Sequence, residues 1–159
     1  SRNGMIFAGT YAAFLSLGKE GYVTESMRMN RLGKKLAKEI NEIEGLQTVV
    51  DTVDTTVVSF TTTSNKYIYS LADLMQKEGW SLNILQNPNS VHLCITPIHT
   101  DEIIEDFVKT LQTQTKKVLS EPLAADSGMA GIYGNSQKIS DPSLVNQVGY
   151  AYLDAYYSE

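Results

Sequence analysis

The 159-residue sequence lacks the residues on which several classes of protein depend. A single cysteine, Cys94, excludes both a disulfide framework and a cysteine-based zinc site. Lysine and arginine number 13 against 18 aspartates and glutamates, and this net charge of −5 argues against a nucleic-acid binder. No apolar run approaches the roughly 20 residues that span a bilayer, and the start does not resemble a signal peptide. No glycine-rich phosphate loop of the P-loop or dinucleotide type is present.

Hydrophobic residues make up 42% of the sequence, which is enough to form a packed core. Hydrophobic periodicity predicts a sheet covered by helices in the middle of the chain, which makes the fold class α/β or α+β. Helices are expected at 5–17, 22–44, 67–78, 101–119 and from Pro142 onward, with strands at 46–50, 56–62, 81–85 and 91–96.

The first of these helices has an unusual pattern. Residues 5–17 are apolar on nearly every side, which predicts a helix buried all round, and Gly18 and Gly21 are expected to end it. A free-standing domain rarely begins with its most buried helix. We therefore expect the chain to be the C-terminal part of a longer polypeptide.

Few side chains stand out as chemical candidates from the sequence alone. His92 and His99 flank one predicted strand on opposite faces, so a shared metal is not expected. Cys94 lies among apolar neighbours, which predicts a small buried hydrophobe rather than a nucleophile. Tyr133 lies in a glycine-rich loop, where glycine allows a close approach to a ligand, although a structural tyrosine fits equally. Two interpretations of His92 remain open: a residue at a strand edge whose hydrogen bonds are satisfied, or a site residue.

Two groups of surface residues are most simply explained without a functional role. The lysines Lys34, Lys35 and Lys38 are predicted to form a solvated helix face. The tyrosines near the C-terminus either mark an interface or, for about half of them, pack on the body of the protein.

Three stretches of sequence resemble the sphingosine-1-phosphate lyases, members of the pyridoxal-phosphate-dependent group II decarboxylase family. The first is Ser-Arg-Asn-Gly at 1–4 with Leu-Gly-Lys-Glu-Gly-Tyr at 17–22. The second is Gly-Trp-Ser-Leu-Asn-Ile-Leu-Gln at 79–86 with Ser-Val-His-Leu-Cys-Ile-Thr at 90–96. The third is Gly-Met-Ala-Gly-Ile-Tyr-Gly at 128–134 with Tyr-Leu-Asp-Ala-Tyr-Tyr at 152–157.

This resemblance implies the C-terminal part of the aspartate-aminotransferase-like fold type I, an antiparallel-rich sheet covered by helices. It implies that residues 1–30 are the end of a large cofactor-binding domain with a connecting helix. It also implies that residues 31–159 form a small domain with a substrate-side loop at 121–140. The implied activity is that of an aldehyde-lyase, which uses pyridoxal 5′-phosphate to cleave a phosphorylated sphingoid base into a long-chain aldehyde and phosphoethanolamine. The implied partners are the large domain and the second subunit of a homodimer, with no nucleic acid.

The resemblance also carries over individual residues. Tyr133 and Met129 are expected at the substrate, and His92 stands where amino-acid decarboxylases place an arginine for the α-carboxylate. Ser1 and Arg2 are expected at the cofactor phosphate, either in the same subunit or in the neighbouring one. No metal is implied. The family's Schiff-base lysine lies upstream of residue 1, so no catalytic residue is expected here and the chain alone should be inactive.

Two alternatives remain open, a non-catalytic binding or dimerisation domain of the same fold and the small domain of an amino-acid decarboxylase. The cellular compartment also remains undecided. We expect a soluble, cytosol-facing segment of an enzyme that is either anchored in the endoplasmic reticulum, as in eukaryotes, or soluble or host-delivered, as in bacteria.

Overall fold

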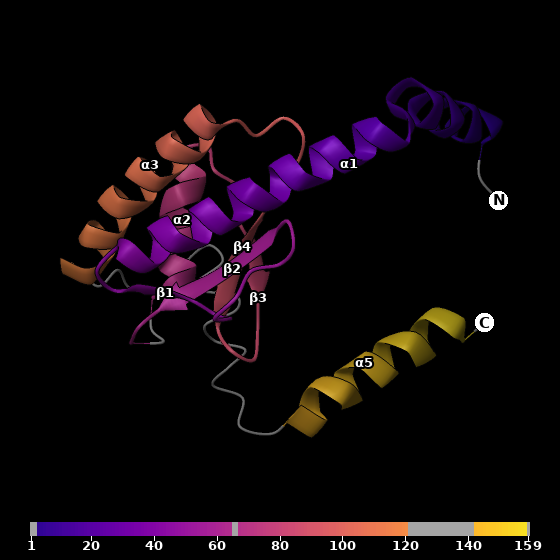
Figure 1. The fold of residues 1–159 in the computed structure, drawn as a ribbon. Coiled ribbons are helices and arrows are strands. Elements are labelled where there is room, and N and C mark those ends of the chain that lie inside the picture. Colours follow the sequence, from indigo (N-terminus) through magenta and orange to yellow (C-terminus); the bar gives the residue numbers. More distant parts are fainter. Residues whose placement is uncertain (1–2, 65–66, 121–141, 159) are drawn as a thin grey trace.

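The computed structural model describes residues 3–64, 67–120 and 142–158. The elements in chain order are α1 (Gly4–Glu42), β1 (Leu46–Thr48), β2 (Val57–Thr62), α2 (Ile68–Lys77), β3 (Asn83–Leu85), β4 (Ser90–Cys94), α3 (Asp101–Ser120) and α5 (Pro142–Tyr157) (Figure 1). Every predicted strand and helix in the middle of the chain is present, with ends that differ from the prediction by at most two residues.

The four strands form one sheet in the order β1-β2-β4-β3, and every neighbouring pair is antiparallel. The strand predicted at 91–96 is mostly apolar, which is typical of a central strand, and β4 lies between β2 and β3. The expected α/β class with an antiparallel-rich, helix-covered sheet is therefore confirmed.

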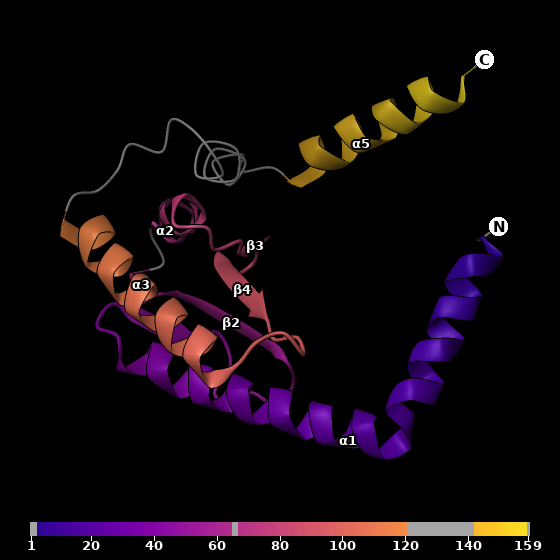
Figure 2. The ribbon, with the colours of Figure 1, turned by 90° about the horizontal axis from the view of Figure 1, so that it is seen from above.

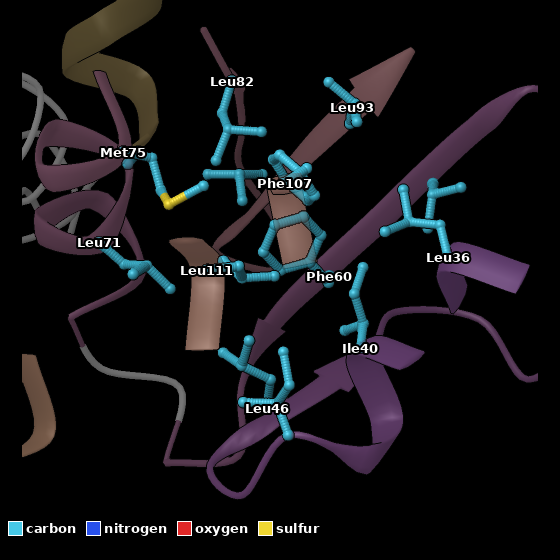
Figure 3. Close-up of a cluster of buried hydrophobic side chains, with 14 of the residues drawn as sticks. Leu36, Ile40, Leu46, Phe60, Leu71, Met75, Leu82, Leu93, Phe107 and Leu111 are labelled. Carbon is cyan, nitrogen blue, oxygen red and sulfur yellow. The ribbon is translucent and has the colours of Figure 1, made fainter. Parts of the chain in front are cut away.

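Side chains alternate along the strands, and among the described residues helices α1, α2 and α3 pack against one face of the sheet. Val58, Phe60, Val91 and Leu93 point to that face and are buried in a single cluster with side chains of α1, α2 and α3. Figure 3 shows Phe60 and Leu93 within this cluster. Figure 2 shows how the helices lie around the sheet. The periodic positions predicted for the helices supply the other side of this core. They are Leu32, Leu36 and Ile40 of α1, Leu71 and Met75 of α2, and Ile104, Phe107, Leu111 and Val118 of α3.

The two helices predicted for residues 5–44 are continuous except for a kink at Gly18. Gly18 has φ 59° and ψ 178°, a conformation that only glycine adopts readily, and the chain bends sharply there (Figure 2). Gly21 lies within the helix, so its predicted role as a helix end was wrong. The helix ends at Glu42 rather than at the predicted Glu44, and Gly45, with φ 91°, lies two residues beyond the C-cap Ile43.

The segment before the kink, Gly4–Leu17, is the N-terminal arm. It was predicted to be buried all round, but its large apolar side chains are exposed, from 46% for Leu17 to 77% for Met5. Phe14 meets the ring of Tyr22 across the kink, with the centroids 5.5 Å apart, and is still 55% exposed. Full burial of this arm therefore needs contacts that the described residues do not supply.

The last helix begins at Pro142 as predicted, because proline suits the first helical turn. Its tyrosines do not pack on the body, contrary to one of the two expectations: Tyr150, Tyr152, Tyr156 and Tyr157 are 68–76% exposed. In the parts of the chain that the structure describes, no helix combines the length and apolar character needed to cross a membrane.

Candidate functional site

The face of the sheet away from the helices, the open face, carries the polar side chains of the strands. In β2 and β4 the residues that alternate with the core positions include the polar pair Ser59 and His92 and, next to it, the pair of Val57 and Cys94. The four strands contain no Asp, Glu, Lys or Arg. The open face is therefore polar but, apart from the imidazole and the thiol, without ionisable groups.

His92 lies at the centre of this face. Its Cα partners are Ser59 on β2 and Asn83 on β3, so the three residues form one line across three strands, the polar row. His92 is half-buried, and its Nδ1 atom is buried with no hydrogen-bond partner among the described residues. The expectation of a satisfied residue at a strand edge was wrong, because β4 is internal and the ring is not satisfied.

Cys94 shares the open face with His92 and is exposed. The prediction of a small buried hydrophobe was wrong because its apolar neighbours Leu93 and Ile95 point to the opposite, helix-covered face. Strand alternation, rather than the composition of the adjacent residues, decides its exposure.

His99 lies outside the strand, in the turn before α3. Its Nδ1 accepts a hydrogen bond from the Thr96 backbone N–H at 3.0 Å and lies 2.9 Å from the Thr96 hydroxyl, which makes it a turn-stabilising residue. Within residues 3–64, 67–120 and 142–158, no group of three or more His, Cys, Asp or Glu could hold a metal ion.

The same turn is tied to α1 by charged side chains. Arg28 donates to the backbone carbonyls of Pro97 and His99 at 2.7 and 2.6 Å and pairs with Glu25. Arg31 forms a two-pronged ion pair with Asp101 at the start of α3. These contacts fix the end of β4, and with it the open face, relative to the helix that leads into the sheet.

The lysines predicted to be a solvated helix face are each paired with an acidic side chain. Lys35 bonds to Asp101 and Glu105 and is only 27% exposed, while Lys34 lies 3.4 Å from Asp54 and Lys38 3.8 Å from Glu42. The prediction of a solvated face holds for Lys34 and Lys38, which are 56% and 79% exposed, and fails for Lys35, whose partners on α3 are remote in sequence.

The Asp101 carboxylate has an abnormal pKa because Arg31 and Lys35 both bond to it. Hydrogen bonds from Arg31 and then Lys35 hold its pKa well below the ordinary value. A carboxyl whose pKa is depressed by folding stabilises the protein above its unfolded pKa, and that contribution is lost as the pH falls through the folded pKa. Asp101→Asn should lower the melting temperature by about 1–4 °C at pH 7. The difference from wild type should shrink as the pH falls below about 4.

Asp106→Asn is the matched control for this prediction, because Asp106 lies on the same helix and has no ion pair with any described residue. Thermal melts of both variants between pH 2 and pH 7 test it. A constant difference for Asp101→Asn across that range would contradict the assignment.

Of the site residues predicted from the sequence, the structure describes one, His92. Ser1, Arg2, Met129 and Tyr133 lie outside the described residues, so their predicted roles are neither supported nor opposed by the fold. Ser59 and Asn83 were not predicted. The alternation of each strand would have indicated their face, but their position beside His92 depends on strand pairing.

The described residues do not make up a pyridoxal phosphate site by themselves. Every described lysine and arginine lies on α1, α2 or α3, and none belongs to the strands of the open face. An imine-forming lysine and a phosphate cradle would therefore have to come from outside the described residues.

Comparisons with known proteins place the chain in a family. No family model matches it. A sphingosine-1-phosphate lyase of Arabidopsis thaliana is 36% identical over 157 residues, which is 99% of this chain and 28% of the relative. A solved sphingosine-1-phosphate lyase of Burkholderia pseudomallei is similar in fold over 99% of this chain, with a TM-score of 0.64 and 24% identity. A glutamate decarboxylase of Lactobacillus brevis has the same TM-score over 74% of the chain, with 17% identity.

The chain spans between a quarter and a third of the length of these proteins, 28% of the plant enzyme, 30% of the Burkholderia chain and 29% of the decarboxylase chain. The structural likeness confirms the fold expected for the small-domain part of fold type I pyridoxal phosphate enzymes. The sequence likeness extends over nearly every residue. The chain therefore belongs to the sphingosine-1-phosphate lyase family, and corresponds to a segment of such a lyase.

Proposed function

We propose that these residues are part of a pyridoxal-phosphate-dependent aldehyde-lyase, which cleaves a phosphorylated long-chain base into a long-chain aldehyde and phosphoethanolamine. The observation that carries this proposal is the sequence match to sphingosine-1-phosphate lyases along 99% of the chain. A match confined to the core helices and strands would support only the fold, whereas this one includes the site segments around His92 and Tyr133.

The open face favours this substrate over an α-amino acid. An α-carboxylate in a protein site is usually held by arginine, whose guanidinium can form two parallel hydrogen bonds with it. The described arginines, Arg28 and Arg31, are on α1 and are engaged with the turn before α3 and with Asp101. A phosphorylated long-chain base has no α-carboxylate, so an uncharged open face centred on His92 suits it.

The part of this segment in the reaction is to bind and orient the substrate. His92 and, outside the described residues, Met129 and Tyr133 are proposed as substrate contacts, and Ser1 and Arg2 as contacts to the cofactor phosphate. The division into residues 1–30, belonging to the large domain and connector, and 31–159, the small domain, is part of the same proposal. So are the homodimer and the cytosol-facing location.

The test is turnover by the complete polypeptide. A chain of the relatives' length that contains these residues, supplied with pyridoxal phosphate, should release a long-chain aldehyde from sphingosine 1-phosphate. The 159 residues alone should release none, because the described part holds no cofactor site.

Aldehyde release and carbon dioxide release are measured in parallel, with glutamate as the alternative substrate. Decarboxylation without aldehyde release by the complete polypeptide would contradict the proposed reaction. Specific turnover by the pure 159-residue chain would contradict the proposed division of the site.

A further inference from the structure

We propose that the polar row, Ser59, His92 and Asn83, recognises the hydroxyl group of an amphipathic ligand. The neighbouring pair Val57 and Cys94 would contact the start of its alkyl chain. The inference rests on the proposed function and specifies how this segment would distinguish its substrate. In the proposed substrate, the hydroxyl is the one on carbon 3, next to the bond that is cleaved.

The geometry places the three side chains within reach of one ligand group. Ser59 and His92 are paired across β2 and β4, and His92 and Asn83 across β4 and β3. Adjacent strands lie about 4.8 Å apart, so the row spans about 10 Å with His92 at its centre. All three side chains lie on the open face, which the helices of the core do not cover.

None of the three side chains is engaged within the described fold. No hydrogen bond joins Ser59, His92 or Asn83 through its side chain to any part of the chain that the structure describes. The buried Nδ1 atom of His92 is the clearest case, because a buried polar atom without a partner lowers stability. Such an atom is expected where a ligand, rather than the fold, completes the hydrogen bonding.

The chemistry of the row indicates a neutral polar group. A serine hydroxyl, an imidazole and a carboxamide can each donate and accept, which matches a hydroxyl that does both. A phosphate or carboxylate is usually held by fixed cations, and the four strands carry none. The phosphate of the substrate should therefore lie elsewhere, beyond the open face.

The residues next to the row are apolar. Two positions along from Ser59 and His92, Val57 and Cys94 are paired with each other and both are exposed, Val57 to 41%. A polar row bordered by an apolar pair suits a ligand with a hydroxyl next to a hydrocarbon chain. Valine and a free thiol both lose unfavourable water contact when such a chain covers them.

The experiment measures binding in the complete polypeptide without cofactor, where no turnover can occur. Titration calorimetry compares sphingosine 1-phosphate with its 3-deoxy analogue. Wild type should prefer the hydroxyl-bearing ligand by about ten-fold or more, because a site built to bond a hydroxyl disfavours the analogue that lacks it. In Ser59→Ala, Asn83→Ala and His92→Gln the preference should fall to about two-fold or less, with little change in affinity for the 3-deoxy analogue.

Gln47→Ala is the matched control. Gln47 is an exposed polar residue of β1 paired with Thr61, on the open face but outside the row, so its loss should leave the preference unchanged. Circular dichroism confirms that each variant is folded. His92→Asn replaces His92→Gln if the latter unfolds.

Two outcomes would overturn the inference, an unchanged preference in all three row variants and an equal loss in Gln47→Ala. The proposed function is tested separately by aldehyde release from the cofactor-loaded wild type. If the wild type cleaves the substrate while the row variants retain the preference, only the inference fails. If the wild type does not cleave it, the proposed function fails.

Discussion

Phe107→Ala is expected to lower the free energy of unfolding by about 3–5 kcal/mol, roughly a fifth or more of the stability of an ordinary domain. Phe107 is completely buried in the first half of α3, within the core cluster (Figure 3). Its ring meets Trp80 edge-on with the centroids 5.2 Å apart. Truncation removes buried area and leaves a cavity that the surrounding rigid elements cannot fill.

Phe7→Ala makes the same chemical change at a position in the N-terminal arm where the ring is 64% exposed. It should change the unfolding free energy by less than about 0.5 kcal/mol. Because it removes exposed apolar surface, it should instead reduce self-association of the isolated chain. Urea unfolding and sedimentation of both variants separate the effects. Equal destabilisation by the two would mean that the arm is packed in solution, contrary to the structure.

Tyr133→Phe in the complete lyase is expected to cost about 1.5–4 kcal/mol of transition-state stabilisation, or roughly ten- to several-hundred-fold in kcat/KM. Tyr133 stands in the glycine-rich stretch of sequence that resembles the lyases, and its phenol can donate to a substrate hydroxyl or phosphate. The substitution retains the ring, so folding and cofactor absorbance should barely change.

A structural tyrosine would give the opposite result, a lower melting temperature with near-normal turnover for each folded molecule. Measuring kcat/KM and thermal stability on the same variant distinguishes the two roles. Tyr152→Phe serves as the control, because Tyr152 lies on α5 and is 68% exposed. An unchanged kcat/KM for Tyr133→Phe would remove Tyr133 from the site.

Periodicity predicted the core of this fold because the core is formed by local patterns that face each other. Leu32, Leu36 and Ile40 recur at helical spacing and all three are completely buried. The same reasoning failed for the N-terminal arm, where Phe7 and Leu15 are exposed. A pattern indicates that a surface needs a partner, but it does not say whether that partner lies within the same 159 residues.

The candidate site was predicted only in part because it depends on strand register. The sequence around His92 predicted a strand and resembled that of the lyases, and both are supported. Ser59 and Asn83 lie 33 and 9 residues away from it in the chain and come beside it only because β2 and β3 both pair with β4. Likewise, the partners of Lys35 on α3 are set by how two helices pack, which no local pattern encodes.

A small change in the backbone torsion angles of Gly18 would move the far end of the N-terminal arm by a large distance. The arm before it would extend about 20 Å at the helical rise of 1.5 Å per residue. A rotation of only about 10° at this one residue would therefore displace the far end of the arm by about 3–4 Å, as far as the width of a methyl group. Whatever surface receives the arm is thus aligned with the sheet through two torsion angles of a single glycine. An alanine there, which strongly disfavours φ 59° with ψ 178°, would misdirect the arm while leaving every core contact intact.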